Sequence, residues 1–303
     1  MTVGTAGNGT VRLAYESFGP DTGEPLLLLM GLDSPMRWWP DGFCLRLAER
    51  GFCVVRFDYR DIGRSSRVPG RPGPGHPGTR PGRAGASYAL PDLVGDAVAV
   101  LDGLGMPSAH LVGHSLGAGV ALATALYRPD RVRTVTSISG LPRGYRIADA
   151  ARYVDPRGLV RMLPSAALPP RTREQHVRRQ VTLARMLASP RFPFDERWAR
   201  LTAQQVADDG PTDPATGARQ LAAMRADARV LRHPERIGVP LLALHGADDP
   251  LLRSCAAAAL ARAVPGGRAV VFAGMGHEVP QRLWPAIVDE IVRNADRARV
   301  LAG

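Results

Sequence analysis

The stretch Gly113-His114-Ser115-Leu116-Gly117 decides how the rest of the chain is interpreted. It follows a short strand-like apolar run, His110-Leu111-Val112, and precedes a helix-length apolar segment, Leu116–Tyr127. A serine hydroxyl is a weak nucleophile at neutral pH, and a tight turn between strand and helix presents it to a base, clear of its own backbone. Such a turn strains the serine, and the flanking glycines keep side chains out of the bend. The pattern predicts a nucleophilic Ser115.

Around this turn, runs rich in leucine and β-branched residues alternate with segments of helical period. This alternation is typical of a parallel sheet covered by helices on both faces. The predicted strands are Val11–Phe18, Leu26–Met30, Cys53–Asp58, His110–Gly113, Val132–Ile138, Pro240–His245 and Ala269–Phe272. The predicted helices are one beginning at Leu90 and those over Leu116–Tyr127, Ala256–Ala263 and Pro285–Ala295. The predicted fold class is α/β, with a mostly parallel central sheet.

Two stretches interrupt the alternation. Residues 66–86 consist largely of proline, glycine and arginine, which predicts a flexible loop within the core domain. This loop follows a predicted strand, so we expect it to leave the sheet near the catalytic groups and to screen their entrance. Residues 140–237 contain helical patterns but no strand, which indicates a helical cap inserted into a core domain made of residues 1–139 and 238–303.

Length and composition exclude several classes of protein. The chain has 303 residues, 45% of them hydrophobic, which is ordinary for a globular protein, and its apolar runs are too short to cross a membrane. The three cysteines, Cys44, Cys53 and Cys255, show no metal-ligand spacing, and the first residues do not read as a signal peptide. We therefore expect a soluble cytoplasmic protein with no metal and no organic cofactor.

The net charge of +11 raises the question of nucleic-acid binding. All 39 basic residues are arginines, as a coding bias toward arginine would produce, and they are scattered rather than gathered on one stripe. Aromatic residues make up 6% of the chain and do not interleave with the arginines as a base-stacking surface requires. Nucleic acid is therefore a weak alternative, and the expected partner is a small molecule.

A base and an orienting acid should follow Ser115 on loops after later strands. The strand ending at His245 leads into Gly246-Ala247-Asp248-Asp249-Pro250, and the final strand leads into Ala273-Gly274-Met275-Gly276-His277. The chain order is therefore serine, aspartate, histidine. The N–H group of Leu116, directly after the nucleophile, is expected to help bind an oxyanion.

The chain resembles the α/β-hydrolase-fold serine esterases, and is most similar to the branch that contains aclacinomycin methylesterase. The resemblance covers nearly the whole length apart from the loop at 66–86. The segments that carry it are the serine turn, Leu29-Met30-Gly31, Trp39-Pro40, Arg56-Phe57-Asp58-Tyr59-Arg60-Asp61-Ile62-Gly63-Arg64-Ser65, Ala247-Asp248-Asp249-Pro250 and Gly274-Met275-Gly276-His277.

The resemblance implies a function and a role for individual residues. Ser115 would be the nucleophile, His277 the base and Asp249, immediately before Pro250, the acid, acting on methyl esters of polycyclic aromatic polyketides. The N–H group of Leu32 would be the second oxyanion donor, although the branch carries glycine there and leucine would narrow the pocket. The predicted function is serine carboxylic-ester hydrolysis through an acyl-enzyme.

Other interpretations of these residues stay open. Met36, Trp38 and Trp39 would line an apolar substrate pocket or pack in the core, whereas His114 and His245 are expected to be structural. The cap arginines Arg178, Arg179 and Arg185 read more readily as a solvated helix face than as an anion site. A cofactor-free perhydrolase or haloperoxidase and a carbon–carbon bond hydrolase would use the same triad. A catalytically silent binding module is the alternative from another class.

Overall fold

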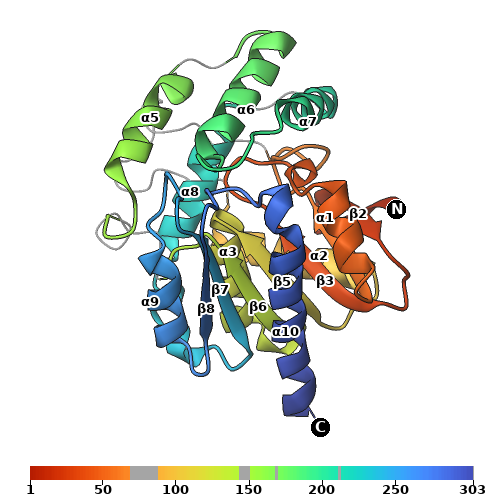
Figure 1. Cartoon of the computed structure of the whole chain (residues 1–303). Helices are drawn as coiled ribbons and strands as arrows, with labels where there is room; N and C mark the ends of the chain where they lie inside the picture. Colours follow the sequence, from red (N-terminus) through yellow and green to blue (C-terminus); the bar gives the residue numbers. More distant parts are fainter. Residues whose placement is uncertain (69–87, 143–150, 168–169, 211–212, 303) are drawn as a thin grey trace.

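The computed structural model describes residues 1–68, 88–142, 151–167, 170–210 and 213–302 (Figure 1). Most of the loop predicted at 66–86, and with it the predicted screening of the entrance, lies outside the described residues. In the part of the chain that is described, no helix is long and apolar enough to cross a membrane.

Within the described ranges, eight strands form one sheet in the order β1-β2-β4-β3-β5-β6-β7-β8. β1 and β2, and β2 and β4, pair antiparallel, and all other pairs are parallel. The strand bounds are β1 Thr2–Asn8, β2 Val11–Phe18, β3 Glu24–Leu29, β4 Phe52–Phe57, β5 Ala109–His114, β6 Val132–Ile138, β7 Leu241–Gly246 and β8 Arg268–Phe272. The seven predicted strands are confirmed, and β1 was missed.

Helices cover both faces of this sheet because its central strands are apolar on both sides. In β3, Leu26 and Leu28 face α1 and α10, whereas Leu27 and Leu29 face the opposite core, formed with α2, α3 and α9. All four leucines have no exposed surface. The helix bounds are α1 Asp41–Ala48, α2 Leu90–Gly103, α3 Leu116–Tyr127, α9 Cys255–Ala263 and α10 Trp284–Ala302. The α/β fold class is confirmed.

Among the described residues between β6 and β7, four α-helices follow one another. They are α5 Pro156–Ala167, α6 Arg173–Leu187, α7 Glu196–Asp208 and α8 Thr216–Ala226, and we call them the cap helices. In Figure 1, α5, α6 and α7 lie beyond the upper end of the strands. A small apolar cluster of Val177, Val181 and Ala203 joins α6 to α7 and packs against Trp38 of the core. The inserted helices agree with the prediction, while the domain limits at 139/140 and 237/238 stay a prediction.

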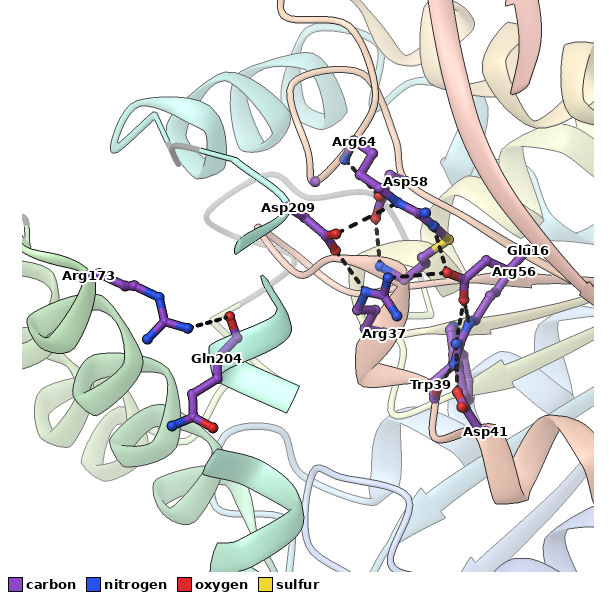
Figure 2. A network of polar contacts seen from close by, with 12 residues as sticks. Glu16, Arg37, Trp39, Asp41, Arg56, Asp58, Arg64, Arg173, Gln204 and Asp209 are labelled. Atoms are coloured by element: carbon purple, nitrogen blue, oxygen red, sulfur yellow. Dashed lines mark hydrogen bonds and ion pairs between the residues drawn. The ribbon is translucent and has the colours of Figure 1, made fainter. Parts of the chain in front are cut away.

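A buried ionic network lies beside the cap (Figure 2). Arg56 on β4 and Glu16 on β2 each expose 1% of their side chains, and Arg56 Nε donates to Glu16 Oε2 at 2.9 Å. Burial alone would raise the pKa of Glu16, but the guanidinium of Arg56 outweighs it and holds that pKa below the ordinary value. Arg37 extends the network to the cap, because its Nε donates to Asp209 at the end of α7 at 2.7 Å.

The network also fixes the loop that follows β3. Arg56 donates to the carbonyl oxygen of Trp39, and its Nη2 donates to Asp41 at 2.6 Å. Asp58, directly after β4, accepts the backbone N–H of Met36 at 2.8 Å. Charged side chains of β4 and of the turn after β4 therefore hold the loop that follows β3.

Replacing Arg56 with methionine is expected to lower the free energy of unfolding by about 3–5 kcal/mol, because Glu16 then stays buried without its innermost partner. The matched control is Arg50→Met. Arg50 also pairs with a carboxylate, that of Asp289, but both side chains are more than 40% exposed. That control should cost less than about 1 kcal/mol. Urea unfolding followed by circular dichroism measures both, and equal losses would contradict the assignment.

Candidate active site

Ser115 lies on the turn that joins β5 to α3. Its backbone has φ 52° and ψ −114°, which is strained for a residue with a side chain. The two glycines of the turn have no room for a side chain: a Cβ at Gly113 would lie 2.3 Å from the carbonyl oxygen of Gly117, and one at Gly117 would lie 2.1 Å from that of Leu29. The predicted strained turn with obligatory glycines is confirmed.

Asp249 and His277 meet on the loops after β7 and β8. His277 Nδ1 donates to Asp249 Oδ2 at 2.8 Å, and Asp249 Oδ1 accepts the N–H groups of Leu251 and Leu252, both at 2.8 Å. Burial would raise the pKa of Asp249, but the His277 charge and these hydrogen bonds outweigh it and place that pKa far below its usual range. The carboxylate therefore stays ionised opposite the imidazole.

The neighbouring carboxylate has different partners. Asp248 Oδ2 accepts the N–H of Gly274 at 3.0 Å and lies 3.1 Å from Arg191 Nε. Asp248 thus ties the loop after β8 to the loop after β7, while Asp249 holds the imidazole. Of the two aspartates that the sequence offered, it is Asp249 that faces His277.

A cavity of about 1250 Å³ opens over the strand ends, and both Ser115 and His277 line it. The cap helices and the loops around them supply an apolar wall: Leu183, Leu187, Phe192, Phe194, Trp198 and Leu201. Trp284 and Val279 line the core side. The cavity exceeds the roughly 300–1,000 Å³ of most small-molecule sites, so it has room for a large apolar ligand.

The two predicted oxyanion donors lie on different elements beside Ser115. Leu116 is the first residue of α3, so its N–H has no acceptor within the helix. Leu32 lies on the loop after β3 and lines the cavity. This loop passes close to Ser115, because a Cβ added to Gly31 would lie 3.4 Å from the Cβ of Ser115.

The three residues predicted to line a pocket or pack in the core differ in whether they line the cavity. Trp38 and Trp39 line the cavity, and the ring of Trp38 meets Trp198 of α7 edge to face with centroids 5.5 Å apart. Met36 is completely buried and is not among the lining residues, which agrees with the alternative that it packs in the core. Its side chain turns inward on the short helix that spans Met36–Trp38, between residues on either side that line the cavity.

Several side chains have contacts near the site that the sequence did not indicate. His114 Nε2 donates to the carbonyl oxygen of His277 at 2.6 Å, and the two rings lie 5.0 Å apart. Of the three cap arginines, Arg178 and Arg185 form exposed ion pairs with Glu174 and Glu196, whereas Arg179 lines the cavity.

Asp33 and Glu278 also line the cavity. Burial raises the pKa of Asp33 to about 6, although the nearby Arg179 opposes the rise. Asp33 is the residue after the predicted oxyanion donor, and Glu278 is the residue after the predicted base. This adjacency in sequence is the signal that could have identified both as residues of the cavity.

A family model described as the alpha/beta hydrolase fold matches residues 24–280 of the chain. The chain belongs to this family. The topology described above, with a serine turn after β5, is that of an α/β hydrolase.

Two methylesterases match this α/β hydrolase over nearly its full length. It is 30% identical to rhodomycin D methylesterase DnrP of Streptomyces peucetius, over 97% of this chain and 98% of that protein. It is 31% identical to rhodomycin D methylesterase DauP of Streptomyces sp. (strain C5), over 96% of this chain and 97% of that protein. A meta-cleavage product hydrolase from Pseudomonas fluorescens IP01 shares the fold, with a TM-score of 0.72, 17% identity and coverage of 98% of both chains.

Among the described residues of this α/β hydrolase, no group of three or more histidine, cysteine, aspartate or glutamate side chains is arranged to hold a metal ion. The polar groups around Ser115 are instead imidazoles and carboxylates joined by hydrogen bonds. They are suited to moving a proton between a hydroxyl and a ring nitrogen.

The buried imidazole of His114 should make the α/β hydrolase sensitive to acid. Burial, followed by the nearby His277, lowers the pKa of His114 from 6.5 to about 3. Between about pH 6.5 and pH 3, the unfolded chain therefore binds a proton at His114, while the folded protein does not. The stabilisation is fully present above about pH 6.5 and is lost as the pH falls toward 3, by up to about 1.4 kcal/mol per pH unit.

Glutamine at position 114 cannot take up this proton. The free energy of unfolding of His114→Gln should therefore fall less steeply than that of wild type between about pH 6 and pH 4. Urea unfolding at a series of pH values measures both slopes. The control is His233→Gln, since the side chain of His233 is 57% exposed. Identical slopes for wild type and the His114 variant would contradict the assignment.

Proposed function

We propose that the protein is a serine carboxylic-ester hydrolase in which Ser115 is the nucleophile, His277 the general base and Asp249 the orienting acid. The observation that carries the proposal is the 2.8 Å hydrogen bond from His277 Nδ1 to Asp249 Oδ2, made where Ser115 and His277 line one cavity. This bond leaves Nε2 as the basic nitrogen of the ring. Near-full-length similarity to two methylesterases supports the ester as the bond broken.

The reaction follows from the protonation states of these groups. His277 Nε2 takes the proton from Ser115 Oγ as that oxygen attacks the ester carbonyl, and the carboxylate of Asp249 stabilises the imidazolium that forms. The N–H groups of Leu32 and Leu116 bind the negative oxygen of the tetrahedral intermediate. The imidazolium then protonates the leaving alcohol, and water releases the acid from the acyl-enzyme by the same steps in reverse order.

The size of the cavity supports a large apolar acyl group. Its apolar wall is built largely from leucine, phenylalanine and tryptophan side chains. Two relatives are named as methylesterases of rhodomycin D. We infer that the substrate is a methyl ester of a polycyclic aromatic compound, bound with its rings against the cap helices and its ester over Ser115.

Ser115→Ala is expected to lower kcat for an activated ester by about 10⁶, to the level that binding and oxyanion contacts sustain without a nucleophile. Hydrolysis of p-nitrophenyl acetate measures the rate. A fluorophosphonate probe should label the wild type and not the variant. Full activity in the variant would overturn the proposal, as would a wild type that neither hydrolyses esters nor takes up the probe.

The two adjacent aspartates provide a matched pair for the same assay. Asp249→Asn should lower kcat by about 10⁴, because the amide cannot hold the imidazole in the required tautomer. Asp248→Asn should change kcat far less, since Asp248 contacts Arg191 and the backbone of Gly274 and not His277. The opposite ranking would assign the acid to Asp248.

A further prediction concerns the substrate class. The methyl ester of a polycyclic aromatic acid should be hydrolysed with a kcat/KM about 10²-fold above that of methyl acetate, because burying about 100 Å² of extra apolar surface is worth roughly 2.5 kcal/mol. Equal values for both esters would contradict the inference. Peracid formation from acetate and peroxide, and cleavage of a carbon–carbon bond in a vinylogous diketone, are measured alongside, and a higher kcat/KM in either would replace the ester as the substrate class.

A further inference from the structure

His245 lies one residue before the end of β7 and four residues before Asp249. Its side chain has no exposed surface, and neither has that of Asp249. Its Nε2 atom lies 3.1 Å from Asp249 Oδ2 and 3.2 Å from the carbonyl oxygen of Leu252. A second imidazole therefore contacts the same carboxylate oxygen that accepts the hydrogen bond from His277.

The surroundings of the ring assign its proton. Nε2 faces two oxygen acceptors, whereas Nδ1 is buried and has no hydrogen-bond partner among the described residues. With the proton on Nδ1, a buried donor would be unsatisfied and the Nε2 lone pair would point at two oxygens. The tautomer assigned from these contacts carries its proton on Nε2 and donates to Asp249 and Leu252.

All the hydrogen bonds of the carboxylate are then fixed in direction. Oδ2 accepts from the imidazoles of His277 and His245, and Oδ1 accepts from the backbone N–H groups of Leu251 and Leu252. The two backbone bonds hold one oxygen in the turn after β7. The His245 bond holds the other, so that rotation of the carboxylate away from His277 would break a bond between a buried donor and a charged acceptor.

We propose that His245 is a positioning residue for the hydrolytic reaction: its Nε2–H donor fixes the rotation of the Asp249 carboxylate so that Oδ2 faces His277 Nδ1. The role rests on the proposed function, because it acts through Asp249 and His277 on Ser115. No proton leaves His245 in any step. The other titratable groups that face His277 are Asp249 itself, His114 from the serine turn and Glu278 next in sequence.

Two substitutions of His245 whose side chains are similar in length distinguish the effect of its hydrogen bond from the effect of its packing. His245→Gln carries an N–H donor near the position of Nε2, whereas His245→Met fills similar space without a donor. In His245→Met, kcat for p-nitrophenyl acetate should fall about 10- to 100-fold, the range for one hydrogen bond to a charged group, with KM unchanged. In His245→Gln, kcat should stay within about threefold of wild type.

The matched control is His110, another buried histidine on a strand of the same sheet. Its ring contacts Thr134 and Glu24 and does not line the cavity. His110→Met and His110→Gln should give the same kcat as each other. Equal losses in the two His245 variants would assign the residue to packing and overturn the proposal, and so would an unchanged kcat in His245→Met.

Imidazole nitrogen NMR of the wild-type protein tests the same contact without a variant that must fold. With ¹⁵N-labelled histidine, the residue-245 ring should carry a proton on Nε2 that exchanges slowly with water. A proton on Nδ1 would overturn the proposal. Labelling by the fluorophosphonate probe reports the proposed function separately. If Ser115 takes up the probe and His245→Met keeps full kcat, only the positioning role fails.

Discussion

The strained backbone of Ser115 is the constraint on which the arrangement of the site depends. A residue with a side chain at φ 52° costs on the order of 1–3 kcal/mol, and it persists only where the surroundings leave no alternative. β5 ends directly before Ser115 and α3 begins directly after it, both elements are buried, and a Cβ added to Gly113 or Gly117 would lie less than 3 Å from neighbouring backbone atoms. The packing of strand and helix thus fixes the serine, and the residues proposed to act with it have to come to it. They do so because parallel strands end at the same edge of the sheet, which brings the loops after β3, β7 and β8 to the same place.

The buried charged side chains next to the site hold the loop after β3 in place. Arg56, Asp58 and Arg37 hold the backbone of Trp39 and Met36 and the end of α7, respectively. These residues lie in or beside segments that carried the resemblance to serine esterases. Their contacts give the loop that carries Leu32 a rigid support. A donor displaced by 1 Å loses much of its stabilisation of an oxyanion, so a support made of directional charged bonds is better suited than apolar contacts alone.

The sequence predicted the parts of the fold in which one residue pattern leads to one structure. Short apolar runs such as Leu26–Met30 have the length of buried strands and not of helices, and the serine turn could be placed because a strand and a helix flank it. β1 was missed because its sequence has few large apolar residues, and only Ala6 in it is buried. The choice of Asp249 over Asp248 came from the resemblance and its position before Pro250, whereas the inward turn of Met36 and the contact of His245 with Asp249 depend on the course of a loop backbone. Sequence spacing does not encode these directions, and they became readable only from the structure.

The histidines around Asp249 also limit where charge appears during a reaction. His114, His245 and His277 are all buried within a short distance of one carboxylate, and a second imidazolium there would repel the first. Burial keeps the pKa of His114 near 3, so that this ring stays neutral and serves only as a donor to the His277 backbone. In the tautomer assigned above, His245 donates to a carboxylate that is already ionised, and its Nδ1 has no hydrogen-bond partner among the described residues. In the proposed reaction, the imidazole that takes up the proton of Ser115 is therefore that of His277, which lines the same cavity. The burial and hydrogen bonding of the other two rings confine the proposed proton transfer to this one.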